Sequence, residues 1–438
     1  MTVWMNVTFT YHWVGPACGI ARQEREIAVA LENKLSDNLK YCIWEFNSFK
    51  EISHEQYHRS FRELPINDRN NASHKVLTKW EKTKKKWKKS VLKRLIKFEE
   101  IFHISTVKKS DNSYEDVSNK PVTAGYNRAF HIFKQNDTFL SLGNDWDYPF
   151  FEMLSYARDI LKIRIVTCAY DLIPIKFPQY CGGNTVERFT NYFYSLLKGS
   201  SAILCISKCT RSDLLKLSNN LKCASPKTQI IRLGADIERN LSSEPLISED
   251  ILKLDNSPFI LFVSTIERRK NHVTLYKAYH LLAEKGLLDK LPPLVFAGMP
   301  GWGVSDIIKD IKFDPLTQGK IILAGRVNDD ELDFLYSNCL FTVFPSSYEG
   351  YGLGVAESLL HGKFVLASSS GSLPEVGKDF AEYLEPWDVL KWADRLTYWS
   401  NHPNELVAKE LAIKQEYKPC TWSDCADDVI SVLSSLKD

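Results

Sequence analysis

The sequence predicts an α/β protein made of two doubly wound domains that face each other across a cleft. Short apolar runs alternate with helical patterns along almost the whole chain of 438 residues, which is typical of parallel sheets covered by helices. The runs fall into two series, separated by a polar segment at residues 236–256. A chain of this length is sufficient for two domains, and such folds bind ligands at the carboxyl ends of their strands.

The two series of apolar runs give the expected strands in chain order. The first series comprises Val3–Thr10, Tyr41–Phe46, Thr138–Leu142, Arg164–Ala169, Ala202–Ile206 and Gln229–Arg232. The second comprises Phe259–Ser264, Pro293–Ala297, Lys320–Ala324, Leu340–Phe344 and Phe364–Ser368. Runs of this length and composition are expected for buried strands. We therefore expect one domain at residues 1–240, a second at residues 241–410, and a last helical segment at residues 411–438.

The composition excludes several classes of protein. Hydrophobic residues make up 44% of the chain and charged residues 25%, which is ordinary for a soluble globular protein. No apolar run approaches the roughly 20 residues that cross a bilayer, and the first residues lack the pattern of a signal peptide. The ten cysteines include no pair of C-x2-C units. We therefore expect a cytoplasmic protein with reduced thiols and no structural zinc.

Residues 51–120 fit the alternating pattern poorly and predict a helical insertion in the first domain. Residues 75–97 carry 11 positive charges against one negative, and the rest of the chain has a net charge of −8. One helical face carries Trp80, Trp87, Val91, Leu95 and Phe98, and lysines such as Lys84 and Lys88 fill the rest. Such a helix docks on an anionic membrane surface or packs with a solvated face. A nucleic-acid partner is the least favoured interpretation.

The most informative segment is residues 345–362. Glu349 and Glu357 stand with seven residues between them, and a glycine-rich turn fills the first half of the gap. The turn joins a predicted strand to a predicted helix, so backbone N–H groups and a positive helix end meet an anion there. The two carboxylates can accept hydrogen bonds from a polyol. The segment therefore suits a sugar nucleotide, although Glu357, expected at the start of the helix, could by itself be a capping residue.

A cluster of cations follows the first strand of the second series. Arg268, Arg269 and Lys270 lie at a strand end, before a helical pattern, which is a favourable place to bind a diphosphate. Fixed cations there would stabilise the charge that develops on the β-phosphate when the bond to the sugar breaks. The alternative is a solvated basic turn.

This arrangement resembles the retaining glycosyltransferases with the E-x7-E signature, namely glycosyltransferase family 4, which have the two-domain GT-B fold. Further segments carry the resemblance: residues 262–271, 323–327, 331–336 and 371–376. Order and spacing agree from about residue 258 to 388. The resemblance implies that the terminal helix crosses back to the first domain. It also implies that the donor is a nucleotide sugar and that neither a metal nor another cofactor is required.

The resemblance also assigns roles in the second domain. Lys270 and an arginine would stabilise the leaving diphosphate. Arg269 is favoured over Arg268, because some branches of the family keep a basic residue directly before the lysine. Glu357 would bind the ribose hydroxyls, and Glu349 would face the donor sugar. Further donor-binding positions are Val327 on the nucleoside side and the backbone N–H groups of Gly352 and Leu353.

In the first domain the resemblance places Gly19 in a loop that closes over the diphosphate. Tyr170 stands where many members have a histidine near the reacting sugar. Asp171 would orient the acceptor hydroxyl or take its proton, or else cap the next turn. Ser207, after the strand Ala202–Ile206, is a further candidate for the acceptor side of the cleft.

Asp145 and Asp147 form a D-x-D sequence of the kind that binds a metal with the nucleotide in the other major glycosyltransferase fold. The pair lies in the first half of the chain, whereas the donor motifs lie in the second. We therefore predict a loop near the acceptor cleft and no metal site.

The predicted function is transfer of a hexose to a hydroxyl of a growing, lipid-linked surface polysaccharide, with retention of configuration. Residues 19–22, 141–146 and 170–174 look like those of bacterial surface-polysaccharide enzymes, many of them mannosyltransferases. GDP-mannose is therefore the first expectation for the donor, followed by UDP-sugars. Two alternatives remain: a nucleotide-sugar 2-epimerase on the same fold, and a non-catalytic nucleotide-sugar-binding protein. The expected location is the cytoplasm or the cytoplasmic membrane face.

Overall fold

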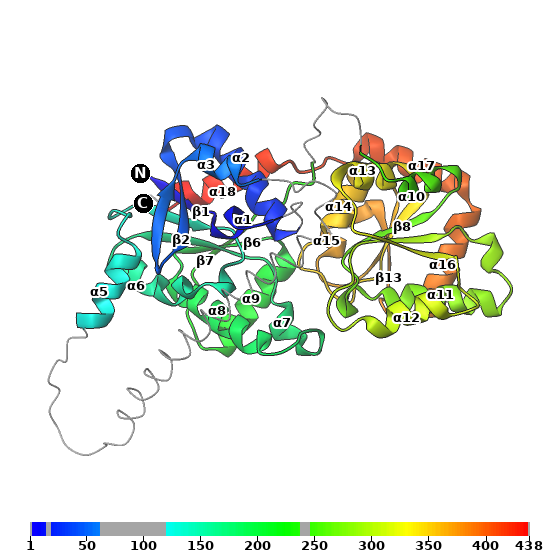
Figure 1. Ribbon diagram of the computed structural model, residues 1–438, viewed down its shortest axis with the longest axis horizontal. Coiled ribbons are helices and arrows are strands. Elements are labelled where there is room, and N and C mark those ends of the chain that lie inside the picture. Colours follow the sequence, from blue (N-terminus) through cyan, green and yellow to red (C-terminus); the bar gives the residue numbers. More distant parts are fainter. Residues whose placement is uncertain (1, 15–18, 62–119, 237–245, 437–438) are drawn as a thin grey trace, which may run out of the picture.

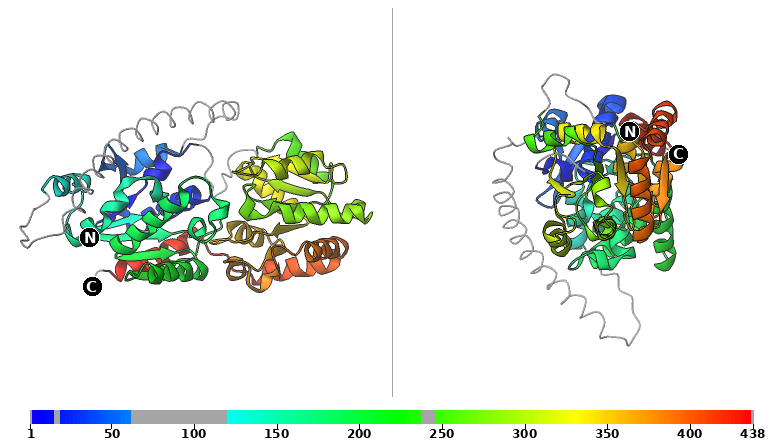
Figure 2. Two further views of the ribbon diagram at one scale, coloured as in Figure 1. Left: turned by 90° about the horizontal axis from the view of Figure 1, so that it is seen from below. Right: turned by 90° about the vertical axis from the view of Figure 1, so that its right-hand side faces the viewer.

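The computed structural model describes residues 2–14, 19–61, 120–236 and 246–436. It contains two lobes, each built on one sheet with helices packed against it (Figures 1 and 2). The first sheet has 7 strands in the order β3-β2-β1-β4-β5-β6-β7, and the second has 6 in the order β10-β9-β8-β11-β12-β13. Within the described residues only the β2–β3 pairing is antiparallel. The prediction of two doubly wound α/β domains is confirmed.

Every apolar run predicted to be a strand overlaps one, although β7 shares only residues 229 and 230 with its prediction. The first sheet consists of β1 Val3–Asn6, β2 Leu39–Glu45, β3 Ser48–Ile52, β4 Thr138–Ser141, β5 Arg164–Ala169, β6 Ala202–Cys205 and β7 Lys227–Ile230. The second consists of β8 Ile260–Val263, β9 Leu294–Ala297, β10 Ile321–Gly325, β11 Phe341–Phe344, β12 Val365–Ser368 and β13 Ala381–Leu384. The edge strands β3 and β13 were not predicted. Since β3 ends at Ile52, the expected insertion cannot begin at residue 51 as a helix.

The first predicted strand was too long. Residues Val3–Thr10 were expected to be extended, but β1 ends at Asn6 and the helix α1 occupies Thr8–Tyr11. The backbone N–H and hydroxyl of Thr8 both donate to Oδ1 of Asn6, and the Thr8 hydroxyl accepts from the N–H of Trp44. Local side-chain hydrogen bonds of this kind compete with strand pairing and turn the chain.

The helices of the first lobe cover both faces of its sheet. They are α2 Ile20–Leu35, α3 His54–Arg59, α5 Lys120–Ala129, α6 Leu154–Asp159, α7 Ile173–Lys176, α8 Thr185–Gly199 and α9 Lys208–Asn220. Neighbouring strand residues pack into different apolar clusters: Ile165 and Ile203 into one, Val166 and Leu204 into the other. This alternation is expected for strands buried on both faces.

The second lobe has the same layered construction. Its helices are α10 Glu249–Leu252, α11 His272–Glu284, α12 Ser305–Phe313, α13 Asp329–Asn338, α14 Leu353–Leu360, α15 Leu373–Gly377, α16 Val389–Asn401 and α17 Pro403–Glu416. Here too, successive residues of β8 pack into different clusters, Ile260 into one and Leu261 into the other. Each lobe therefore has its own hydrophobic core.

The last helix, α18 Trp422–Ser434, packs in the first lobe (Figure 1). Trp422 and Val429 are buried in the same apolar cluster as Ile27 and Leu31 of α2. The backbone N–H of Trp422 donates to Oδ1 of Asp236 over 2.8 Å, and its indole N–H donates to the Asp236 carbonyl over 2.9 Å. The end of the chain is thus fixed to the lobe in which the chain begins.

Several predictions about the insertion concern residues outside those described. Trp80, Trp87, Lys84 and Lys88, proposed to face a membrane surface, all lie in the range 62–119. Among the helices that the structure describes, none combines the length and the apolarity of a membrane span. The described cysteines are free thiols, and Cys168 and Cys205 are buried.

The contact between Gly234 and Trp422 yields a stability prediction. A Cβ atom on Gly234 would lie 2.4 Å from the backbone nitrogen of Trp422 and 2.6 Å from its ring. Gly234→Ala should therefore displace α18 and lower Tm in a thermal melt by several degrees, since overpacking costs roughly 1–3 kcal/mol. Gly125→Ala in α5 is the matched control, because its new Cβ meets nothing within 4 Å. Equal Tm values for both variants would contradict this role of Gly234.

Candidate active site

The centre of the site is the carboxylate of Glu349, in the turn between β11 and α14. Its Oε2 accepts a hydrogen bond from Nη1 of Arg269 at 2.6 Å, and its Oε1 accepts one from Nζ of Lys270 at 2.6 Å. The hydroxyl of Ser346 also donates to Oε1, at 2.7 Å. The structure thus brings Glu349 into contact with two adjacent cations that precede it by 80 and 79 positions in the sequence. The arginine that pairs with the glutamate is Arg269 and not Arg268. Arg268 is exposed.

The basic turn is held against this loop by Asn271. Residues Arg268–Lys270 form a short 3-10 helix, and Asn271 follows in the left-handed conformation with φ 60°. Asparagine tolerates this conformation better than most residues. Its side-chain amide donates to the carbonyl oxygens of Pro345 and Pro386 at 3.1 and 2.6 Å. The two cations are therefore anchored to the start of the glutamate-bearing turn.

The backbone of Glu349 is held from the other side by residues 371 and 372. The N–H and the hydroxyl of Ser372 donate to the Glu349 carbonyl at 3.2 and 3.0 Å. Gly371 has φ +66°, and a Cβ there would lie 2.5 Å from the same carbonyl oxygen. Only glycine fits so close an approach with a left-handed backbone.

The electrostatics of the cluster keep Glu349 ionised. Burial opposes its ionisation, but Lys270 and Arg269 outweigh burial and lower its pKa to about 2. Arg269 is partly buried, which opposes its charge, yet the negative charges of Glu349, Asp171 and Glu267 raise its pKa above the ordinary value. The site therefore holds a fixed anion and two fixed cations at neutral pH.

Glu357 forms a second cluster, on α14. Its Oε2 accepts a hydrogen bond from the hydroxyl of Tyr336 in α13 at 2.9 Å. Its Oε1 lies 3.4 Å from Nη1 of Arg22, which comes from the first lobe and also pairs with Asp329. Because α14 begins at Leu353, Glu357 lies in its second turn. The expectation that Glu357 begins the helix was wrong, and helix capping does not explain this residue.

Glycines shape the backbone on both sides of the cleft. Gly352 precedes α14 with φ 108°, and a Cβ there would lie 2.6 Å from Leu373. A glycine is therefore needed to give the backbone N–H groups of Gly352 and Leu353 their position at the start of α14. Gly19 precedes α2 with φ 53°, and a Cβ added there would meet none of the described residues within 4 Å. Val327 is half-buried beside the apolar cluster that contains Leu332, between β10 and α13.

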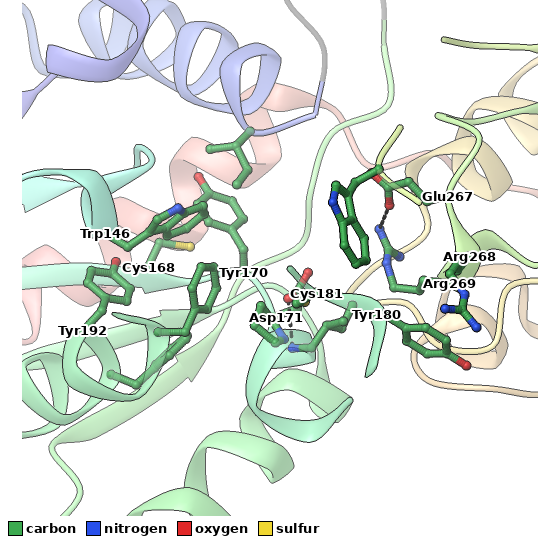
Figure 3. Close-up of a pocket in the computed structure, with 16 residues that line it drawn as sticks. Trp146, Cys168, Tyr170, Asp171, Tyr180, Cys181, Tyr192, Glu267, Arg268 and Arg269 are labelled. Atoms are coloured by element: carbon green, nitrogen blue, oxygen red, sulfur yellow. Dashed lines mark hydrogen bonds and ion pairs between the residues drawn. The ribbon is translucent and has the colours of Figure 1, made fainter. Parts of the chain in front are cut away.

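A cleft of about 430 Å³ has walls from both lobes, and Arg269 of the Glu349 cluster is one of its lining residues (Figure 3). The first lobe contributes aromatic side chains, among which the rings of Trp146 and Phe189 lie 4.7 Å apart. The second lobe contributes Glu267, Arg268 and Arg269. An apolar wall facing fixed cations suits a ligand with a sugar ring on one side and an anionic group on the other.

Asp171 and Tyr170 line this cleft at the carboxyl end of β5. Burial raises the pKa of Asp171, while the positive charges of Arg269 and Lys270 oppose the shift. The Tyr170 hydroxyl donates to the carbonyl of Leu142, so it is already engaged within the lobe. Oδ1 of Asp171 accepts from the N–H of Ile173 at 3.1 Å, which is the turn-capping contact weighed from the sequence.

Ser207 lies at the boundary between the two lobes. It is not among the residues that line the cleft. Its hydroxyl accepts from the N–H of Thr210 at 2.9 Å, which caps α9, and donates to the carbonyl of Gly350 at 2.7 Å. Ser207 is therefore a contact between the lobes, and its role on the acceptor side of the cleft stays a prediction.

The two carboxylates of the D-x-D sequence have separate partners. Oδ1 of buried Asp145 accepts from the side-chain amide of Asn6 at 3.2 Å. Asp147 pairs with Arg188 at 2.8 Å. In the part of the chain that the structure describes, no three His, Cys, Asp or Glu side chains come close enough together to hold a metal ion.

The structure adds residues to which the sequence assigned no role. Arg22 lies in the first turn of α2, just after Gly19, but nothing in its spacing indicates a partner more than 300 residues away. Trp302 lines the cleft from the loop after β9, and its ring lies 2.9 Å from where a Cβ on Gly182 would be. Gly301 and Gly303 on either side of it indicate a loop, but they do not indicate that the loop reaches a cleft.

Comparison with known proteins gives the family. Residues 243–414 match the family model described as Glycosyl transferases group 1. O-antigen chain mannosyltransferase B of Escherichia coli is 30% identical over 274 residues, covering 62% of this chain and 71% of the relative. The chain belongs to the group 1 glycosyltransferases. It is therefore an enzyme of the hexosyltransferase type.

Other relatives of this glycosyltransferase agree. Serotype-specific mannosyltransferase WbdA of Escherichia coli is 26% identical over 229 residues, which cover 51% of this chain but only 27% of that protein. Anabaena HepE, solved in complex with UDP and glucose, superimposes with a TM-score of 0.57 at 14% identity, covering 99% of this chain and 100% of that chain. Sucrose-phosphate synthase of Thermosynechococcus elongatus gives 0.58 at 16% identity, covering 100% and 99%. The fold of this glycosyltransferase is GT-B.

The environment of Asp145 predicts a pH-dependent stability difference. Burial raises its pKa to about 7 from an ordinary value of 3.8. Ionisation therefore favours the unfolded chain, and this cost grows as the pH rises from about 4 to about 7. Asp145→Asn removes the charge while keeping an oxygen for Asn6. Its Tm relative to wild type should rise across that window and level off above it.

Thermal melts of both proteins from pH 4 to pH 8 measure this difference. Asp147→Asn is the matched control, since Asp147 lies two residues away and pairs with Arg188. It should show no such gain with pH. A Tm difference for Asp145→Asn that is the same at pH 4 and pH 8 would refute the assignment of the buried charge.

Proposed function

We propose that this glycosyltransferase moves a hexose, with retention of configuration, from a nucleoside-diphosphate sugar to a hydroxyl of a surface polysaccharide. The observation that carries the proposal is the Glu349 carboxylate held between Arg269 and Lys270 at a cleft between two lobes. Relatives named as an O-antigen chain mannosyltransferase and a serotype-specific mannosyltransferase favour mannose as the sugar and GDP-mannose as the donor. UDP-sugars are the second choice, and HepE was solved with UDP.

In this proposal the diphosphate lies against Arg269 and Lys270. An arginine has five N–H donors and a lysine has three, so both can hold Glu349 and still donate to phosphate oxygens. Glu349 fixes the direction of the two cations and accepts hydrogen bonds from the donor sugar. The N–H groups at Gly352 and Leu353, at the start of α14, contribute further donors and a positive helix end.

Glu357 binds the ribose hydroxyls in the same proposal. Tyr336 donates to one of its oxygens and so fixes the direction of the carboxylate. Arg22 faces the other oxygen from the opposite lobe and adds a cation to the donor site. Val327 and Gly19 flank the nucleoside and diphosphate positions respectively.

The chemistry follows from these contacts. The bond between the anomeric carbon and the β-phosphate oxygen breaks, and negative charge grows on that oxygen. Arg269 and Lys270 stabilise this charge as it develops, which lowers the barrier. The acceptor oxygen forms its bond on the same face of the sugar, and its proton passes to the leaving phosphate oxygen. No covalent enzyme intermediate and no metal ion take part.

The acceptor enters from the first lobe. Trp146 and neighbouring aromatic residues offer an apolar face on which a sugar ring can stack. Asp171, whose pKa is raised by burial, accepts a hydrogen bond from the acceptor hydroxyl and holds it near the anomeric carbon. A lipid-linked glycan is the acceptor class that we favour, and the basic segment at residues 75–97 would then meet the anionic membrane surface.

A donor panel tests the function. The protein is incubated with GDP-mannose, UDP-glucose and UDP-N-acetylglucosamine, with and without a mannose-terminated oligosaccharide, in excess chelator. GDP-mannose should give the fastest transfer, and NMR should show an α-linked product. Lys270→Ala should lower kcat by roughly 100-fold, as removal of a fixed charge at a developing anion does. A donor converted to its epimer without acceptor, or nucleotide binding without turnover, would contradict the proposal.

Glu357→Gln tests the ribose assignment. The variant keeps the shape of the side chain but loses a charged acceptor, so GDP should bind roughly 10-fold more weakly in calorimetry. Glu382→Gln is the matched control, because Glu382 lies in β13, an edge strand of the second lobe's sheet, and pairs with Arg395. Its GDP affinity should equal that of wild type. Unchanged affinity in Glu357→Gln would remove the residue from the nucleotide site.

A further inference from the structure

The first turn of α9 receives several contacts from the second lobe. In Figure 1, α9 lies on the side of the first lobe that faces the second, and α15 lies across the boundary. Three residues of the second lobe reach this turn: Tyr348, Gly350 and Glu375. Glu375 belongs to residues 371–376, one of the segments that carry the family resemblance.

Glu375 binds the helix N-terminus directly. Its Oε2 accepts from the backbone N–H of Lys208 at 2.8 Å, and its Oε1 accepts from that of Cys209 at 2.7 Å. These are the first two residues of a 13-residue helix, and their N–H groups have no partner within the helix. A carboxylate from the other lobe thus satisfies them and also meets the positive end of the helix dipole.

Gly350, the residue after Glu349, is held by the first turn of α9. Its carbonyl accepts from the hydroxyls of Ser207 and Thr210 at 2.7 and 3.2 Å. A Cβ on Gly350 would lie 2.7 Å from the Cβ of Asp171 and 2.7 Å from the carbonyl of Tyr170. The lobes therefore touch here with no space for a larger residue.

Tyr348, on the other side of Glu349, is anchored to the same helix. Its hydroxyl donates to Oδ2 of Asp213 and accepts from Nζ of Lys176 at 2.8 Å. The Cys209 sulfur lies 2.8 Å from the same hydroxyl oxygen. Both neighbours of Glu349 in sequence are thus fixed by the first lobe, whereas the Glu349 carboxylate is fixed by the second.

A short chain of contacts joins Glu375 to Glu349. Ser372 holds the carbonyl of Glu349, and its hydroxyl also donates to the carbonyl of Tyr351 at 2.6 Å. Ser372 immediately precedes α15, the helix that carries Glu375. Movement of α15 relative to α9 would therefore be passed to the backbone of Glu349.

We propose that the first turn of α9 positions Glu349 for sugar transfer, through Glu375 and the turn 348–350. The backbone position of Glu349 then depends on the contact that the first turn of α9 makes with residues 348–350 and Glu375. Glu375 is a positioning residue, since it acts through Glu349 and touches no substrate. This inference rests on the proposed function, because it assigns Glu349 a part in transfer.

Two single variants weaken the contact between Glu375 and α9 from opposite sides. Glu375→Ala removes the acceptor. Lys208→Pro removes one donor while preserving α9, because proline is favoured at the first position of a helix. Ser207 has φ −159° and ψ 164°, which is compatible with a following proline. Each variant should lower kcat roughly 10- to 100-fold at saturating donor, while GDP affinity stays close to wild type.

The double variant and a matched control separate positioning from loss of structure. Glu375→Ala combined with Lys208→Pro should fall little further than either single variant, since both act through one contact. Glu385→Ala removes a second-lobe glutamate that contacts Ser369 and should leave kcat unchanged. Multiplicative losses in the double variant, or unchanged kcat in both single variants, would overturn the proposal.

Amide hydrogen exchange gives a readout that does not depend on activity. Residues 345–352 should exchange faster in Glu375→Ala than in wild type or Glu385→Ala, because their contact with α9 is released. Equal exchange in all three proteins would overturn the positioning contact. Absence of transfer by the wild-type protein with every donor would instead refute the proposed function, and exchange would still decide the contact.

Discussion

The shared ion pair of Glu349 with Arg269 and Lys270 is the interaction on which the site depends. Burying three charged groups costs several kcal/mol for each ion unless they pair well and satisfy their remaining hydrogen bonds. Here each carboxylate oxygen accepts from one cation at 2.6 Å, and Ser346 adds a third donor. The cost of burial is therefore offset only when the basic turn and the glutamate turn are held at the right distance and orientation to each other.

Several contacts within the second lobe hold these two turns in place. Asn271 ties the basic turn to Pro345, and Ser372 ties the glutamate turn to the segment after β12. Gly371 allows this approach because any Cβ would strike the Glu349 carbonyl. Loops at the carboxyl ends of β8, β11 and β12 thus meet at one point, as expected for ligand sites of doubly wound sheets.

The first lobe completes the arrangement without supplying its central charges. It contributes the aromatic wall of the cleft, Asp171, and the helix turn on which residues 348–350 rest. α18 ties the end of the second lobe's chain back to the first core. A connection of this kind limits how far the lobes can separate, while contacts such as Arg22 with Glu357 cross the gap near the donor residues.

The sequence by itself determined the fold class and the approximate positions of most strands, because buried parallel strands are continuous apolar runs. It also singled out Arg269, Lys270 and Glu349 as candidates for one site, because their motifs lie in order along the chain. It missed β3 and β13, which are short edge strands, and it extended β1 through Thr8, where side-chain hydrogen bonds turn the chain. Only tertiary structure decided that Arg269 rather than Arg268 meets Glu349, that Ser207 joins the lobes, and that Glu375 reaches α9. Such partners lie 80 to 167 residues apart, and local pattern carries no information about contacts at that separation.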